Sequence, residues 1–170
     1  MVKLLHSIRS ARSDDATAIA AVHDAAWREA YNGIIPGKTL ASMINRRGPA
    51  WWMAAIRGGS RILVLEFDGQ VVGYTSFGHN RVAAMPYAGE IFELYLVPEY
   101  QGLGFGGRLF AAARQELAAK GYLSTIVWAL ADNERALRFY ENLGGAEVWR
   151  ATERFGNDIR ARVAFGFAAN

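Results

Sequence analysis

A short glycine-rich stretch carries the clearest chemical signal in this sequence. It runs from residue 102 to residue 107, after an apolar segment and before residues with the apolar spacing of a helix. Glycines between a strand and a helix let backbone N–H groups converge on an anion at the helix N-terminus. A side chain at each position would obstruct that approach. We therefore predict a phosphate-binding loop, with a ligand-free surface turn as the alternative. The amides concerned are those of Gly102, Leu103, Gly104, Phe105, Gly106 and Gly107.

The same glycines also fit the dinucleotide-binding pattern G-x-G-x-x-G, for which Asp132 could supply the acid that binds a ribose. Two features argue against this interpretation. In a dinucleotide fold the glycines follow the strand almost directly, whereas residues 98–101 intervene here. The unit also begins past the middle of the chain, which leaves too little sequence for the second half of such a fold. A dinucleotide-binding protein is therefore a distant alternative.

Two spaced motifs and an N-terminal segment resemble the GNAT superfamily of N-acetyltransferases. Gln101-x-x-Gly104-x-Gly106 follows the apolar residues 94–98 and is similar to the acyl-CoA-binding pattern Gln/Arg-x-x-Gly-x-Gly/Ala. Asn133 and Tyr140 stand where that family has an Asn at a strand–helix turn and a Tyr farther along the helix. Residues 27–36 look like the first-helix segment of one bacterial-type branch. The resemblance covers nearly the whole chain, and the combined spacing makes it specific.

The resemblance implies an α/β fold in a single domain over residues 1–170. A central, mostly antiparallel sheet would splay at its fourth strand, with helices on both faces. Acetyl-CoA would be the acyl donor. The backbone groups of Leu94 and Leu96 would pair with its pantetheine arm as a pseudo-strand. Gln101 would lock the glycine loop, and Asn133 would contact the cofactor arm, a role compatible with that of an ordinary helix N-cap.

Transfer of an acetyl group to an amine requires a proton acceptor, because a free alkyl amine with a pKa of about 10 is mostly protonated at neutral pH. Glu90 and Glu93 lie on the strand that would face the thioester, and alternation along a strand places them on opposite faces. Glu90 would share its face with Leu94 and Leu96, and the family often has a base near this position. We therefore prefer Glu90, although a solvated strand-end carboxylate remains an alternative for either residue.

The departing thiolate needs a proton, and a phenol can supply it. By resemblance, Tyr140 would be this general acid, with packing between helix and sheet as its alternative role. Tyr31 is expected to line the acceptor pocket, which the family builds from its first helices and their loop. The nearby tryptophans could line the same pocket or belong to the core; they are Trp27, Trp51 and Trp52.

Composition narrows the function classes further. The chain has 170 residues, 52% of them apolar, a formal charge of +3 and no cysteine. Without cysteine there is no Cys acyl-enzyme, which favours direct transfer in a ternary complex. The three histidines have no ligand-like spacing, so we expect no metal site. Scattered arginines do not predict nucleic-acid binding. No apolar run or signal segment predicts a membrane or secreted protein, so we expect a cytoplasmic one.

Hydrophobic periodicity and turn residues predict the elements that position these residues. Helices are expected over 16–30, 38–45, around 51–52, over 104–120 and over 133–143. Strands are expected over 4–9, 61–67, 70–78, 90–97 and 125–130, followed by a C-terminal hairpin. In that hairpin, alternation places Ile159, Ala161, Val163, Phe165 and Phe167 on one face.

The acceptor stays open at this stage. A peptide N-terminus, lysine, polyamine, aminoglycoside, amino acid or arylamine would each fit an N-acetyltransferase, and no cationic cluster in the sequence favours an acidic acceptor. A non-catalytic acyl-CoA-binding module is the alternative function, since it would keep the glycine loop without needing Tyr140. Dimerisation through the C-terminal hairpin also stays open.

Overall fold

The computed structural model describes residues 5–169, which fold around one seven-stranded mixed sheet with the strand order β1-β2-β3-β4-β5-β7-β6. The strands are β1 (His6–Ser10), β2 (Arg61–Phe67), β3 (Gln70–His79), β4 (Gly89–Leu96), β5 (Thr125–Leu130), β6 (Ala146–Phe155) and β7 (Asp158–Phe167). The helices are α1 (Ala16–Tyr31), α2 (Gly37–Arg46), α3 (Pro49–Arg57), α4 (Phe105–Ala119) and α5 (Glu134–Asn142), with short 3-10 turns at Ser13–Asp15 and Pro98–Tyr100. No helix within residues 5–169 is long and apolar enough to cross a membrane.

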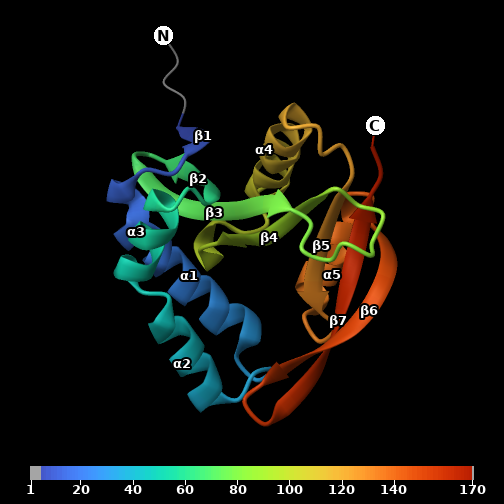
Figure 1. The fold of residues 1–170 in the computed structure, drawn as a ribbon. Helices are drawn as coiled ribbons and strands as arrows, with labels where there is room; N and C mark the ends of the chain where they lie inside the picture. The colour runs from blue at the N-terminus through green and yellow to red at the C-terminus, as the bar shows by residue number, and fades with distance from the viewer. Residues whose placement is uncertain (1–4, 170) are drawn as a thin grey trace.

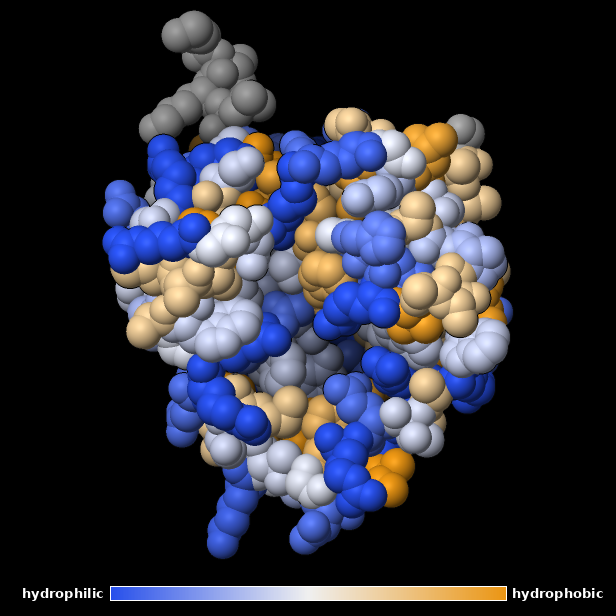
Figure 2. All heavy atoms as spheres, viewed as in Figure 1, coloured by the Kyte–Doolittle hydropathy of each residue, from blue (hydrophilic) through white to orange (hydrophobic). Residues whose placement is uncertain are grey.

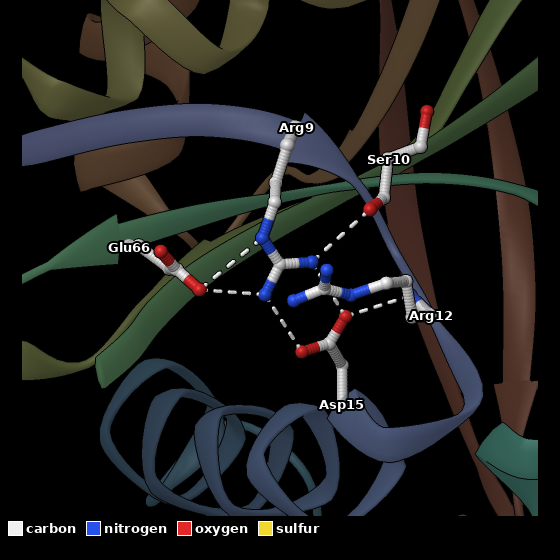
Figure 3. A network of polar contacts seen from close by, with 5 residues as sticks. All are labelled: Arg9, Ser10, Arg12, Asp15 and Glu66. Carbon is white, nitrogen blue, oxygen red and sulfur yellow. Dashed lines mark hydrogen bonds and ion pairs between the residues drawn. The ribbon is translucent and has the colours of Figure 1, made fainter. Parts of the chain in front are cut away.

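Each expected helix and strand is present, with its ends shifted by at most a few residues. Leu4, the expected start of the first strand, lies outside the described residues. The first helix differs at its start: Ser13 does not cap it, because residues 13–15 form a separate 3-10 turn. Arg9 holds this turn by bonding both oxygens of Asp15, at 2.8 and 2.9 Å, and also Glu66 on β2 at 2.6 Å (Figure 3). The ion-pair network thus fixes α1 against the first two strands.

Alternating apolar residues of the sheet build a core on each face. On β2, Ile62 and Val64 pack with residues of α1 and α3, whereas Leu63 and Leu65 pack with residues of α4. Burial of alternate side chains on opposite faces is what the period of two along a strand requires. The helices therefore cover both faces, with α1–α3 on one and α4 and α5 on the other (Figure 1), as expected from the resemblance.

The sheet splays between β4 and β5. These parallel strands pair only at Gly89↔Thr125, Glu90↔Ile126 and Ile91↔Val127. Beyond that point β4 stays paired with β3 as far as Leu96, and β5 stays paired with β7 (Figure 1). The second half of β4 is therefore an edge that β5 does not cover, at the expected fourth strand.

The C-terminal hairpin extends past the rest of the sheet. β7 pairs with β5 only from Arg162 onward, and its first residues pair with β6 alone. Consequently the expected apolar face is buried only at Val163, Phe165 and Phe167, whereas Ile159 is 56% exposed.

Candidate active site

The free edge of β4 presents backbone groups where the strands diverge. The Val97 N–H donates to the Val72 carbonyl on the β3 side at 2.9 Å. Because backbone groups alternate along a strand, those of Leu96 and Leu94 point away from β3. Gln101 confirms this direction, since its Nε2 donates to the Leu96 carbonyl at 3.0 Å. The Leu94 groups and the Leu96 N–H thus face the divergence, and Gln101 ties the following loop to the strand.

The glycines of the loop have two different reasons to be glycine. Gly102 and Gly104 have φ values of +75° and +87°, a left-handed conformation that strains other residues, and a Cβ there would meet nothing within 4 Å. Gly106 instead packs against Phe139 of α5, whose ring would lie 3.0 Å from an added Cβ. Conformation therefore requires glycine in the loop itself, and close helix packing requires it in the first turn of α4.

The loop leads directly into the N-terminus of α4. The helix begins at Phe105, so the first amides have no partner inside it. The Phe105 ring packs against Phe67, whereas the Leu103 side chain is 65% exposed. The predicted phosphate contacts thus concern backbone amides at a helix N-terminus, an arrangement suited to an anion. Those contacts remain a prediction.

Across the divergence, Asn133 is the N-cap of α5. Its Oδ1 accepts a hydrogen bond from the Ala136 amide at 3.3 Å, so the N-cap role is present. Arg135, in the first turn of α5, contacts the Gln101 side chain and pairs with Glu29 of α1 at 2.8 Å. These contacts connect α1, the glycine loop and α5 around one opening.

Tyr140 faces the sheet from α5. Its ring lies between Phe110 and Phe165, with centroid separations of 6.3 and 5.9 Å, so the packing role is present. Burial raises the pKa of Tyr140, and the Tyr31 phenol raises it further. The Tyr140 hydroxyl is therefore protonated at neutral pH. The acid role stays a prediction.

Tyr31 and three other polar residues form a group on the opposite face. The Tyr31 and Tyr95 hydroxyls are 2.7 Å apart. Burial raises the pKa of Tyr31 to about 12. Tyr74 pairs with Tyr95 in the β3–β4 ladder and donates to Glu93 Oε2 at 2.9 Å. Tyr31 is buried, and its hydroxyl reaches toward β4.

Glu90 and Glu93 do not lie on opposite faces, which corrects the expectation from alternation. Ser76 pairs with Glu93, but the next residue, Phe77, pairs with Ile91. The extra residue, Phe92, is a β-bulge that interrupts the alternation. Glu90 therefore shares a face with Glu93, and both are opposite Ile91, Leu94 and Leu96, which pack toward α4.

The two glutamates nevertheless have different surroundings. Glu90 is 1% exposed, and both of its oxygens are occupied by Arg81, through the backbone N–H at 3.0 Å and the guanidinium at 2.7 Å. The Glu93 side chain is 11% exposed, accepts from Tyr74 and pairs with Arg47.

Glu93 lines a groove on this face of the sheet. The groove has a volume of about 460 Å³ and runs from the end of α2 and α3 across β3 to the start of residues 80–88. Figure 2 shows this side of the molecule hollowed between the part formed by α1–α3 and the part formed by β5 and the C-terminal hairpin. Its lining includes Arg47, Trp51, Trp52, Arg61, Arg81 and Glu93.

Sequence reasoning missed several of these residues. Tyr95 could have been found, because it alternates with Leu94 and Leu96 and must face the α1 side. Arg47 and Arg81 come from separate segments, and no local pattern predicts that both line one groove.

The sheet splits between its fourth and fifth strands, and a glycine loop and a helix N-terminus lie at the opening, as expected from the resemblance to the GNAT superfamily. Comparisons with known proteins agree. Residues 18–145 match the family model described as "Acetyltransferase (GNAT) family". The uncharacterized N-acetyltransferase YuaI of Bacillus subtilis (strain 168) is 33% identical over 135 residues, covering 79% of this chain and 77% of that protein.

Two further proteins are similar to this chain. The L-amino acid N-acyltransferase MnaT of Escherichia coli (strain K12) is 30% identical over 138 residues, covering 81% of this chain and 78% of that protein. The crystal structure of PaiA N-acetyltransferase from Thermoplasma acidophilum in complex with coenzyme A has a TM-score of 0.73 at 19% identity, over 94% and 98% of the two chains. The chain belongs to the GNAT acetyltransferase family and is by class an N-acetyltransferase.

Proposed function

We propose that this protein transfers an acetyl group from acetyl-CoA to a primary amine, directly between the two bound substrates. The observation that carries the proposal is the uncovered edge of β4 next to the glycine loop. The coenzyme A bound to the similar PaiA structure supports the same donor here. When bound, the donor supplies a thioester whose carbonyl is open to attack.

The residues at the divergence fit such a donor. Leu94 and Leu96 offer backbone groups in the register that a pseudo-strand needs. The amides of residues 102–107 would bind a pyrophosphate at the positive end of α4. Gly102 and Gly104 leave that approach clear, because a Cβ on either would point into open space that the donor would fill.

We assign proton acceptance to Glu93 rather than to Glu90. Glu93 lines the groove, whereas both carboxylate oxygens of the buried Glu90 accept hydrogen bonds from Arg81. Acceptance through a water molecule would let Glu93 act while it keeps its bonds to Tyr74 and Arg47. The acceptor's ammonium group loses one proton to become a nucleophilic amine and a second as the amide bond forms. The thiolate gains one as the thioester bond breaks, so one proton is released to solvent per turnover.

Tyr140 is the donor of the second proton in this proposal. Its buried hydroxyl holds its proton at neutral pH, and that proton would move to the sulfur atom. Tyr31 would hold the acceptor end of the site through its bond to Tyr95. A cytoplasmic location and dimerisation through the β6–β7 hairpin belong to the same proposal and are testable by fractionation and sedimentation.

The test is acetyl-CoA binding followed by turnover. Acetyl-CoA should raise the thermal unfolding midpoint, whereas NAD should not. Release of CoA thiol should then depend on an added amine. Stabilisation by acetyl-CoA without any amine-dependent release would indicate the non-catalytic binding module instead, and stabilisation by NAD alone would refute the assignment of the loop.

A further inference from the structure

Tyr31 spans the gap that opens between β4 and β5. The two strands pair no farther than Ile91↔Val127. Tyr95 of β4 and Leu130 of β5 lie beyond that point, where the strands diverge. Tyr31 belongs to one hydrophobic cluster with both of these residues, and its hydroxyl oxygen lies 2.7 Å from that of Tyr95. The last residue of α1 thus bridges the gap on the face of the sheet that α1–α3 cover.

The same end of α1 is also tied to the start of α5. Glu29, two residues before Tyr31, pairs with Arg135 at 2.8 Å. Arg135 in turn lies two residues after Asn133, the N-cap of α5. Burial raises the pKa of Tyr31 to about 12, and the nearby hydrogen-bonding side chains of Tyr95 and Asn133 act against that rise. Asn133 therefore lies beside the Tyr31 hydroxyl.

The hydrogen-bonding capacity at this junction is sufficient for both contacts of Tyr31. The Asn133 Oδ1 already accepts from the Ala136 amide at 3.3 Å, which leaves its Nδ2 as the group that can donate to Tyr31. A tyrosine hydroxyl can donate one hydrogen bond and accept others, so Tyr31 can bond Tyr95 and Asn133 together. The Asn133 side chain is thus held from two sides, by the helix that it caps and by the hydroxyl of α1.

We propose that Tyr31 is a positioning residue for the pantetheine arm of acetyl-CoA. The inference rests on the proposed function, in which the arm lies along the edge of β4 and contacts Asn133. Tyr31 closes one side of the gap, and its hydroxyl keeps the Asn133 side chain in one orientation. A side chain that is held in advance loses little entropy when a ligand binds, so this hydroxyl raises the affinity for the arm.

The nucleotide end of the donor would bind at a separate place. Its phosphates would meet the amides of residues 102–107 at the N-terminus of α4. Among the described residues, the hydrophobic cluster that contains Tyr31 includes no member of that loop. Removal of the Tyr31 hydroxyl should therefore affect the arm and spare the nucleotide.

Calorimetric titration with two ligands separates the arm from the nucleotide. Acetyl-CoA carries both, whereas 3′-phosphoadenosine 5′-diphosphate is the same nucleotide without the arm. Tyr31→Phe keeps the ring and removes only the hydroxyl. It should raise the Kd of acetyl-CoA by about 3- to 10-fold, the effect of losing one hydrogen bond, and should leave the Kd of the nucleotide unchanged. A merely structural role would change both Kd values or neither.

A second variant tests whether the hydroxyl acts through Asn133. Asn133→Ser keeps an oxygen that can cap α5 and removes the amide group. In Tyr31→Phe/Asn133→Ser, the Kd of acetyl-CoA should equal that of Asn133→Ser alone, because residues in one hydrogen-bond network do not contribute additively. Tyr122→Phe is the matched control, since this tyrosine packs with His79 and lies past the C-terminal end of α4. It should change neither Kd, and thermal unfolding checks that each variant is folded.

The outcomes separate this inference from the proposed function. If the unmodified protein does not bind acetyl-CoA, both are overturned. Acetyl-CoA binding without amine-dependent CoA release overturns the proposed catalysis alone. This inference alone is overturned by an unchanged Kd of acetyl-CoA in Tyr31→Phe, by an equal loss of affinity for the nucleotide, or by additive effects in the double variant.

Discussion

Glu90 and Glu93 lie on one face of one strand, each beside an arginine and an aromatic ring, yet only Glu93 lines the groove. Glu90 holds the segment between β3 and β4 against the sheet through three bonds to Arg81. Glu93 accepts a hydrogen bond from the buried Tyr74 and pairs with Arg47, which lines the groove. The comparison teaches that burial alone does not mark a catalytic carboxylate. We therefore base the proposed base role on whether the carboxylate itself lines the groove.

Replacement of Glu93 should have the largest effect on turnover. We expect Glu93→Gln to lower kcat by about 10²- to 10⁴-fold, the range that general base catalysis contributes. Acetyl-CoA affinity should be nearly unchanged, because the donor binds on the loop side. Steady-state kinetics and calorimetric titration measure the two quantities, and a kcat within threefold of the unmodified protein would return the base role to Glu90.

Tyr140 offers a test on the other side of the divergence. Tyr140→Phe should lower kcat by about 10²-fold, because it removes the proton donor while the ring still packs between Phe110 and Phe165. Donor affinity should not change. Unaltered turnover would leave Tyr140 only its packing role.

A buried histidine of α1 should control stability at acid pH. His23 is fully buried between Trp27 and Trp52, and burial, with a further effect of Arg47, lowers its pKa from 6.5 to about 4. Between these two values the unfolded chain binds more protons, so stability is complete above about pH 6.5 and falls toward pH 4, by about 3 kcal/mol in total. His23→Leu should remove this slope in urea unfolding, whereas the exposed His79→Gln should keep it. Parallel pH profiles for His23→Leu and the unmodified chain would contradict the assignment.

Glu90→Gln should have its main effect on stability. We expect a loss of about 1–3 kcal/mol of unfolding free energy, the cost of weakening a buried charged hydrogen bond, with kcat changed by less than about threefold. Urea unfolding and steady-state kinetics on one preparation test both parts. A loss of turnover as large as that of Glu93→Gln would remove the distinction between the two residues.

The fold was largely predictable because its signals are local. Alternation predicted the strands, and the glycine loop with the Asn133 and Tyr140 spacing indicated the family. Two features of the site could not be predicted from local sequence signals. The bulge at Phe92 changes which face Glu90 occupies relative to Leu94 and Leu96, and the sequence has no glycine or proline there that would indicate a bulge. Arg47 and Arg81 come from different elements, so only the tertiary structure shows that both line the groove.

The central claim, that the loop beside the divergence holds the donor, is tested most directly by calorimetric titration with acetyl-CoA. The unmodified protein should bind it, and Gly104→Val should abolish binding, because the valine side chain would project into the space needed by the pyrophosphate at a position with φ of +87°. Gly107→Ala, whose Cβ would make ordinary contact with Leu143 at 3.8 Å, is the control for folding of α4. Loss of binding in a folded Gly104→Val variant supports the account, and retained affinity in that variant would contradict it.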